Sequence, residues 1–202
     1  MLIGKFVTLR VIEKSDAEMI RVWKNSPENY NYFANRNFIS DIKQENWISS
    51  KLVDNSGLYF IIIDNKTGIP IGMTLLEDID HRNRNACWGI YIADLKYRKR
   101  IYALEATYLL LNYAFDYLNL YKIYGNTLSC NPKGRNFHQF MGFTEEAVFN
   151  NHVFVNGSYS DLLWIRMFSE EWNKKKEELS KLIANSMIKR EDESKNDKKA
   201  RD

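Results

Sequence analysis

The sequence predicts one α+β domain with a mixed, mostly antiparallel central sheet flanked by helices, followed by a C-terminal helix and a charged tail. Three observations lead to this fold class. Short apolar runs at residues 58–63, 69–76 and 86–92 are separated by polar turns. A strongly periodic helical stretch covers residues 102–118, and the pair Asn156-Gly157 separates two further strand-like runs.

Residues 5–11 alternate in polarity and predict the first strand. The runs at 58–63 and 69–76 are joined by D-N-K-T-G, which is typical of a β-hairpin turn. The third run then extends these two strands into an antiparallel meander. Asn-Gly is the strongest short hairpin signal, so residues 145–155 and 158–167 are expected to pair as the last two strands.

Two helices are expected after the first strand. Ser15 is a candidate N-cap, with Glu18 completing a capping box, and this helix should end before Pro27. Ser40 or Asp41 is expected to cap a second helix that ends near residue 52, after an aromatic and asparagine-rich loop.

The helix at 102–118 carries an apolar stripe that should face the core, formed by Leu104, Tyr108, Leu111, Phe115 and Leu118. It lies between strand 86–92 and a strand at 121–129, so these two strands should pair in parallel through a right-handed crossover. A short helix at 133–141 should end at Gly142.

The chain divides into a domain at residues 1–172 and a C-terminal part at 173–202. That part is a helix followed, from Glu191, by a tail expected to be disordered. The length of 202 residues and 45% hydrophobic content fit one compact domain. A net charge of +3 gives little support for nucleic-acid binding. No membrane-spanning run or signal-peptide pattern is found, so a cytoplasmic location is expected.

Cys87 and Cys130 lack the spacing of a zinc site, so no metal is expected, and each thiol is predicted to be free and buried.

The turn at residues 94–103, D-L-K-Y-R-K-R-I-Y-A, joins strand 86–92 to the long helix. Its cationic residues are Lys96, Arg98, Lys99 and Arg100. A basic turn that opens a helix combines unpaired N–H groups, the positive end of the helix dipole and cations. The turn is therefore a candidate phosphate or pyrophosphate site, with a solvated basic loop as the alternative.

Several short motifs follow one another along residues 2–172. They are T-L-R (8–10), V-W-K-N-S-P (22–27), I-P-I-G (69–72), W-G-I-Y-I (88–92), E-A (105–106), N-Y-A-F (112–115), Asn131, G-F (142–143), and Asp161 with E-W (171–172). In this order and spacing the chain resembles the GNAT N-acetyltransferase superfamily. Within it, the chain is similar to the branch that acetylates ribosomal-protein N-termini and to the nucleotide-amino-sugar acetyltransferases. The resemblance implies the GNAT fold and acetyl-CoA as cosubstrate.

The family's pyrophosphate loop, R/Q-x-x-G-x-G/A, falls on residues 98–103, where Arg98 and Ala103 match and Ile101 replaces glycine. The resemblance implies that coenzyme A is bound by Arg98, Lys99, Arg100, Ile101, Tyr102 and Ala103. We expect this segment to keep helical φ values and to bind through its N–H groups, with loss of acetyl-CoA binding as the alternative. The resemblance also implies that main-chain groups of Ile90, Tyr91 and Ile92 pair with the pantetheine arm.

The family's second cofactor segment, N-x-x-S/A-x-x-L-Y, falls on residues 131–138, and it implies cofactor contacts from Asn131, Arg135 and Asn136. His138 occupies the place of a tyrosine that protonates the departing thiolate, so it is a candidate general acid, with a structural role as the alternative.

The acceptor amine must lose a proton before it attacks. Cys87 stands where many relatives carry a glutamate. Glu77 is therefore the candidate general base, and Asp78 or a water relay are alternatives.

Candidate substrate residues are Trp23, Asn25, Tyr32 and Arg36, together with the amides of the last hairpin. Aromatic faces and neutral amides suit sugar and uracil rings, and Arg36 could meet a diphosphate. We therefore expect an amino-sugar nucleotide as acceptor, with a protein N-terminus second. A non-catalytic protein that binds a ligand or partner is a third reading, and a homodimer is one possible assembly.

Overall fold

The computed structural model describes residues 1–30, 32–34 and 37–199, and within them eight strands form one sheet in the order β1-β2-β3-β4-β5-β6-β8-β7. The strands are β1 (Leu2–Ile3), β2 (Val7–Val11), β3 (Leu58–Asp64), β4 (Pro70–Asp80), β5 (Asn85–Ile92), β6 (Lys122–Leu128), β7 (Thr144–Val155) and β8 (Ser158–Phe168). Neighbouring strands are antiparallel except β5 and β6, which are parallel. The predicted fold class, meander and crossover are confirmed.

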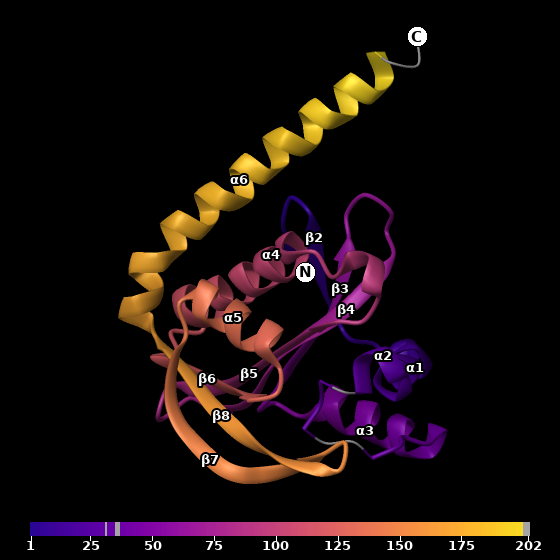
Figure 1. Ribbon diagram of the computed structural model, residues 1–202, viewed down its shortest axis with the longest axis vertical. Coiled ribbons are helices and arrows are strands. Elements are labelled where there is room, and N and C mark those ends of the chain that lie inside the picture. The colour runs from indigo at the N-terminus through magenta and orange to yellow at the C-terminus, as the bar shows by residue number, and fades with distance from the viewer. Residues whose placement is uncertain (31, 35–36, 200–202) are drawn as a thin grey trace.

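Helices cover both faces of the sheet (Figure 1). They are η1 (Lys14–Asp16), α1 (Ala17–Asn25), α2 (Pro27–Tyr30), α3 (Asp41–Val53), η2 (Leu95–Tyr97), α4 (Arg100–Asn112), the π-helical turn η3 (Tyr113–Tyr117), α5 (Pro132–Met141) and α6 (Ser169–Lys199). Strand β3 shows why two layers form. Phe60 and Ile62 pack in the larger core under α4, α5 and α6, whereas Tyr59 and Ile61 pack in a smaller core under α1 and α3.

Helix α4 and the π-helical turn η3 that continues it carry the expected buried stripe, with Leu104 and Leu111 of α4 and Phe115 of η3 in the larger core. Helix α4 also anchors the start of the chain. The buried Glu105 carboxylate accepts backbone N–H bonds from Lys5 (2.7 Å), Phe6 (2.5 Å) and Val7 (2.8 Å). The helix that follows the basic turn is therefore fixed to β2 as well as to the core.

The predicted hairpin turn, helix end and helix cap are confirmed. Asn156 and Gly157 have φ of 50° and 85°, which is the pattern of a type I′ turn. Gly142 ends α5 with φ of 98°, a value that glycine adopts without strain. Ser40 caps α3 by accepting from Lys43 N at 3.4 Å.

Two sequence predictions are wrong. The capping box is made by Glu13 and Asp16 at η1, two residues before the expected Ser15 and Glu18. Cys130 is exposed because it follows the end of β6, whereas Cys87 is half-buried, and both thiols are free.

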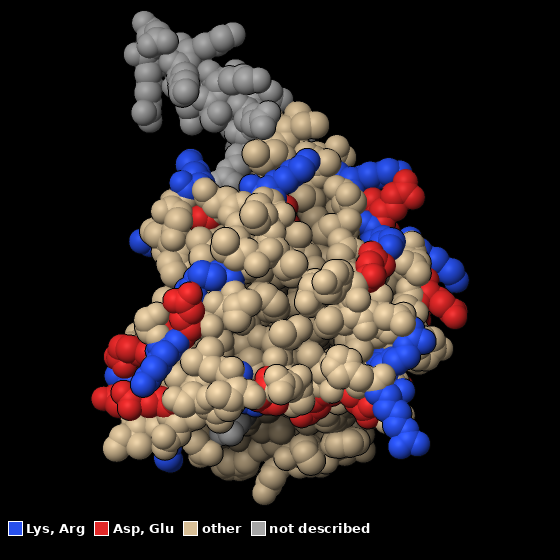
Figure 2. Space-filling model, turned by 180° about the vertical axis from the view of Figure 1, so that it is seen from behind, with Lys and Arg blue, Asp and Glu red and all other residues tan. Residues whose placement is uncertain are grey.

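Helix α6 packs Trp172, Leu179 and Ile183 against the larger core and then extends away from the body of the domain (Figure 1). Its backbone stays helical to Lys199, past Glu191, so disorder of this segment in solution stays a prediction. On the face in Figure 2, lysine, arginine and acidic side chains lie mainly around the margins, and the central region is made of other residues. Within the described residues, no helix is long and apolar enough to cross a membrane.

Candidate acetyl-CoA and acceptor site

The basic turn lies where the sequence predicts, between the carboxyl end of β5 and the N-terminus of α4. Asp94 caps η2 by accepting from Lys96 N at 2.9 Å, and α4 then begins at Arg100. Among the described residues, the backbone N–H groups of Arg100 and Ile101 have no acceptor. Lys99 and Arg100 are exposed beside them. Free amides, a helix dipole and cations at one point fit a diphosphate.

Ile101 fits this turn without strain, because it lies in the first turn of α4 with a helical backbone. Its side chain is half-buried against the larger core. The neighbouring Tyr102 is buried in that core, and its ring lies 5.4 Å from that of Tyr97. Ala103 is half-buried in the same turn. Helical φ at position 101 is confirmed, so glycine is not needed there for backbone conformation.

Strands β5 and β6 diverge next to this turn. Their parallel register covers only Asn85 to Cys87, although β5 continues to Ile92. At the point of divergence a Cβ on Gly125 would lie 2.7 Å from Trp88 O, so only glycine fits there. Beyond Cys87, the main-chain groups of β5 that face β6 are not paired with that strand, and an extended ligand could bind them.

The predicted pantetheine-binding residues lie in this part of β5, which pairs with β4 on one edge but not with β6 on the other. Ile90 and Ile92 pack against the larger core, and Tyr91 points to the opposite side of the sheet, in the smaller core.

The side chain of Arg98 does not lie free beside the turn. Its Nε donates to Ile92 O at 3.1 Å, and its Nη2 donates to Glu28 O at 3.0 Å and to Asn29 Oδ1. Its guanidinium carbon lies 5.2 Å from the Tyr32 ring centroid. Arg98 therefore joins the cofactor turn to α2, a contact that its position in the motif does not indicate.

In α5, Asn131 is the N-cap, and its side chain accepts from Gly134 N at 3.0 Å. Arg135 is partly exposed and paired with Glu145 at 2.5 Å, and Asn136 is exposed. The guanidinium of Arg100 lies 4.7 Å from the Phe140 ring centroid, so α5 lies beside the N-terminus of α4. Asn131 thus shapes the helix, while its predicted contact with the cofactor stays a prediction.

His138 is buried, with its ring 5.4 Å from Trp88 and 6.1 Å from Phe143. Burial lowers the pKa of His138 to about 4, so the imidazole is neutral near pH 7. A neutral imidazole is a poor proton donor to a thiolate, which argues against the predicted general acid. Its Nδ1 and the Nε1 of Trp88 are buried, and neither has a partner among the described residues.

Glu77 ends the regular part of β4, opposite Cys87 in the register. It accepts from Tyr59 Oη at 2.9 Å and lies 3.5 Å from Lys51 Nζ. Burial, with the Glu77 and Asp78 carboxylates, raises the pKa of the Cys87 thiol to about 12, so this thiol stays protonated. Glu77 is on the α1 and α3 side of the sheet, and its role as base stays a prediction.

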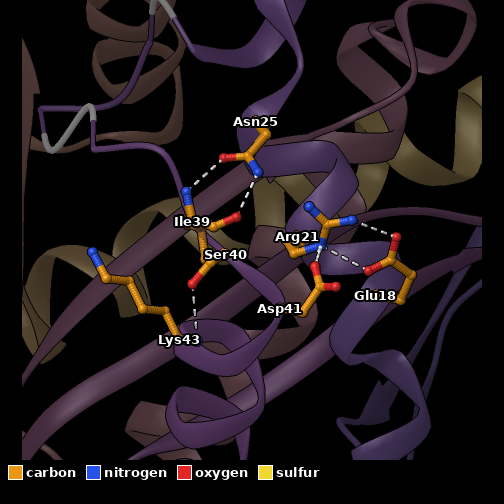
Figure 3. A network of polar contacts seen from close by, with 7 residues as sticks. All are labelled: Glu18, Arg21, Asn25, Ile39, Ser40, Asp41 and Lys43. Atoms are coloured by element: carbon orange, nitrogen blue, oxygen red, sulfur yellow. Dashed lines mark hydrogen bonds and ion pairs between the residues drawn. The ribbon is translucent and has the colours of Figure 1, made fainter.

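Asn25 has a structural role in a polar network between α1 and α3 (Figure 3). Its Nδ2 donates to Ile39 O at 2.8 Å, and its Oδ1 accepts from Ile39 N at 3.0 Å. Beside it, Arg21 pairs with Glu18 at 2.7 Å and with Asp41 at 2.9 Å. Asn25 therefore holds the segment before α3 in place, and its predicted contact with the substrate stays a prediction.

The other candidate substrate residues differ in their surroundings. Trp23 is half-buried, and its ring lies 6.4 Å from Tyr91 in an edge-on contact. Tyr32 lines an open cleft of about 580 Å³. Arg36 lies outside the described residues.

This cleft is formed by the end of β6, the β7–β8 hairpin and Tyr32. Its lining consists of Tyr32, Ser129, Cys130, Asn151, Val155, Asn156, Ser158, Tyr159, Ser160 and Asp161. Ser129 and Ser160 hydroxyls are 3.0 Å apart, and Asp161 Oδ1 accepts from Asn151 N at 2.8 Å. The structure thus brings together an early aromatic residue and the last hairpin, as predicted. The serines carried no motif signal: Ser158 and Ser160 could have been indicated only by their place after the hairpin turn, and Ser129 only by its place just after the end of β6.

Comparison with known proteins decides the family. A family model described as "Acetyltransferase (GNAT) domain" matches residues 7–144. The chain belongs to the GNAT acetyltransferase family. This GNAT protein is therefore an N-acetyltransferase that uses acetyl-CoA, and the non-catalytic reading of the sequence is set aside.

Similar proteins include the spermidine N(1)-acetyltransferase of Vibrio cholerae, which is 29% identical over 77% of this GNAT chain and 89% of the relative. A candidate ribosomal N-acetyltransferase of Bacillus subtilis is 26% identical over 86% and 97% of the two chains. A crystal structure of the Vibrio cholerae spermidine N-acetyltransferase with CoA and spermine has a TM-score of 0.77. It is 26% identical and covers 84% of this chain and 99% of that chain. The GNAT fold is confirmed, and the Vibrio cholerae relative is named for a polyamine, spermidine, rather than for an amino sugar.

Proposed function

We propose that this enzyme transfers the acetyl group of acetyl-CoA to the primary amine of a small, hydroxyl-rich acceptor, most simply an amino sugar carried on a nucleotide. The observation that supports this acceptor is the lining of the cleft. Among its described residues, hydroxyl and amide side chains predominate, and Asp161 is the one carboxylate. Such a surface offers hydrogen bonds to sugar hydroxyls and one anionic partner for a single ammonium group.

A polyamine is the second candidate, because the Vibrio cholerae relative is a spermidine acetyltransferase whose solved structure contains spermine. A polyamine carries several positive charges along a flexible chain, and each buried charge needs an anionic partner. A single carboxylate in the described lining favours the acceptor with a single charge. The family relationship favours the polyamine, so both belong in the same assay.

In the proposed reaction, the diphosphate of acetyl-CoA is bound by the N–H groups at the start of α4 and by Lys99 and Arg100. Unpaired main-chain groups of β5 hold the pantetheine arm and hydrogen-bond the thioester carbonyl. The acceptor amine, with a pKa near 10 in water, loses a proton to Glu77 or to water and attacks the carbonyl carbon. The carbon–sulfur bond then breaks, and the proton that the nitrogen of the tetrahedral adduct loses passes to the sulfur, directly or through water, so that CoA leaves as the thiol.

Steady-state release of CoA thiol tests the acceptor. The panel contains a UDP-4-amino-4,6-dideoxy sugar, spermidine and a peptide with a free N-terminus. We expect kcat/KM for the amino sugar to exceed that for spermidine by about tenfold or more, the discrimination given by a few matched hydrogen bonds. A preference for spermidine or for the peptide would overturn the acceptor assignment and leave the acetyltransferase activity intact.

A pair of tyrosine variants tests the cleft. Tyr32→Ala should raise KM for the acceptor and leave KM for acetyl-CoA less affected, because Tyr32 lines the cleft. Tyr117→Ala removes an exposed ring from η3, where it stacks on Tyr113 at 5.0 Å, and serves as the matched control. Equal effects of the two substitutions on acceptor KM would exclude the cleft as the acceptor site.

A further inference from the structure

Arg98 belongs to the cofactor turn by sequence but contacts the acceptor side of the domain. Its guanidinium donates to the carbonyl of Ile92 at the end of β5 and to the carbonyl of Glu28 in α2. It also donates to the Asn29 side chain and lies over the Tyr32 ring. Among the described residues its Nη1 has no partner, which leaves one N–H-bearing nitrogen for a phosphate oxygen.

Asn29 depends on this contact. It is a buried amide with 4% of its surface exposed, and its Nδ2 donates to Trp23 O at 2.9 Å and to Ser26 Oγ at 2.8 Å. Arg98 is the donor to its Oδ1. A buried carbonyl oxygen that loses its donor is destabilised, so Asn29 and Arg98 hold each other in place.

Helix α2 has four residues, a length at which a helix is not stable without tertiary contacts. Its position therefore depends on its neighbours. Besides the Asn29 bonds given above, one set of contacts is made by the Arg98 guanidinium. A second set is on β5, where the Tyr91 ring lies 6.4 Å from that of Trp23 and 5.2 Å from that of Phe33. Both sets tie the segment that leads to Tyr32 and the acceptor cleft to the strand and turn that face coenzyme A.

We propose that Arg98 is a positioning residue that couples acetyl-CoA binding to the order of α2 and Tyr32. The proposal rests on the proposed function in requiring that coenzyme A binds at the start of α4. A diphosphate there fixes residues 99–101 and engages Arg98, and the same guanidinium then fixes Asn29 and the Tyr32 ring. Binding energies are reciprocal, so an acceptor that orders Tyr32 also tightens coenzyme A.

Hydrogen exchange of the full chain, followed by mass spectrometry with CoA as the probe, tests this coupling. Calorimetry establishes that the protein is saturated. In the wild-type protein, CoA should slow exchange of the peptide covering residues 23–30, which contains the Asn29 and Tyr30 amides bonded to Ser26 O, by about tenfold. Arg98→Lys keeps the charge but cannot form the planar fork, so CoA should still bind while the slowing is lost.

Arg82→Lys is the matched control, because it makes the same substitution at an exposed arginine between β4 and β5, outside the cofactor turn. This variant should retain the slowed exchange. If CoA binds the wild-type chain without slowing exchange at residues 23–30, or if Arg98→Lys retains the slowing, the coupling is wrong and the proposed function stands. If CoA does not bind the wild-type chain, the proposed function fails and the coupling fails with it. Where Arg98→Lys does not fold, the absence of slowed exchange in the wild-type chain with CoA bound would still overturn the coupling.

Discussion

The buried imidazole of His138 makes a quantitative prediction about acid stability. Its pKa is about 4 in the folded protein and near 6.5 in an unfolded chain, so the unfolded state takes up the proton first as pH falls. The stabilisation from the neutral ring is complete above pH 6.5 and is lost between pH 6.5 and 4. A difference of this size corresponds to about 3 kcal/mol of unfolding free energy.

Urea unfolding of wild type and His138→Phe at pH 7, 6, 5 and 4 measures this contribution. Carboxylates titrate in both proteins, so the difference between the two curves isolates His138. Phenylalanine suits the aromatic surroundings formed by Trp88 and Phe143, and we expect the variant to lose about 3 kcal/mol less than wild type between pH 7 and 4. His152→Gln changes an exposed histidine and should follow wild type. Identical slopes for wild type and His138→Phe would refute the buried neutral state and restore His138 as a candidate acid.

Three further substitutions test the architecture around the site. Glu105→Ala leaves the Lys5, Phe6 and Val7 amides without their acceptor and should cost about 3–6 kcal/mol in urea unfolding, whereas exposed Glu170→Gln should cost less than about 0.5 kcal/mol. A loss below about 1 kcal/mol for Glu105→Ala would contradict the anchoring role. Ile101→Gly restores the family residue but removes a half-buried side chain from a helix, so Tm should fall and calorimetry should detect no tighter CoA binding. Tighter binding would mean that the β-branched side chain limits approach of the diphosphate. Asn25→Ala removes both bonds to Ile39 and should destabilise the protein by about 1–3 kcal/mol, with little change in acceptor KM where the variant is fully folded. A large rise in acceptor KM without loss of stability would return Asn25 to the substrate site.

Features set by neighbouring residues in the sequence could be predicted. The Asn156-Gly157 turn, the Gly142 helix end and the apolar stripe of α4 each depend on backbone preference or on periodicity within a few residues. The parallel pairing of β5 and β6 also followed from the order of elements, because a helix that connects two strands of one sheet usually makes a right-handed crossover between parallel strands.

Features set by distant residues could not be predicted. The capping box forms at Glu13 and Asp16 rather than at Ser15 and Glu18 because Arg10 of β2 binds the Asp16 carboxylate at 2.8 Å and 3.0 Å. This ion pair fixes the carboxylate beside Glu13 N. The partners of Arg98 lie about seventy residues earlier in the chain, and a motif does not specify them. The motif position of His138 likewise gave no sign of its burial, which depends on Trp88 and Phe143.

The bond between the start of the chain and Glu105 has a consequence for synthesis. The acceptor of the residue 5–7 amides, the Glu105 carboxylate, is synthesised 98 to 100 residues later. At the usual speed of translation that interval lasts about 5–20 s. During this time the amides of residues 5–7 lack this acceptor, so they are exposed to chaperones, although β2 can already pair with β3, its neighbour in the finished sheet.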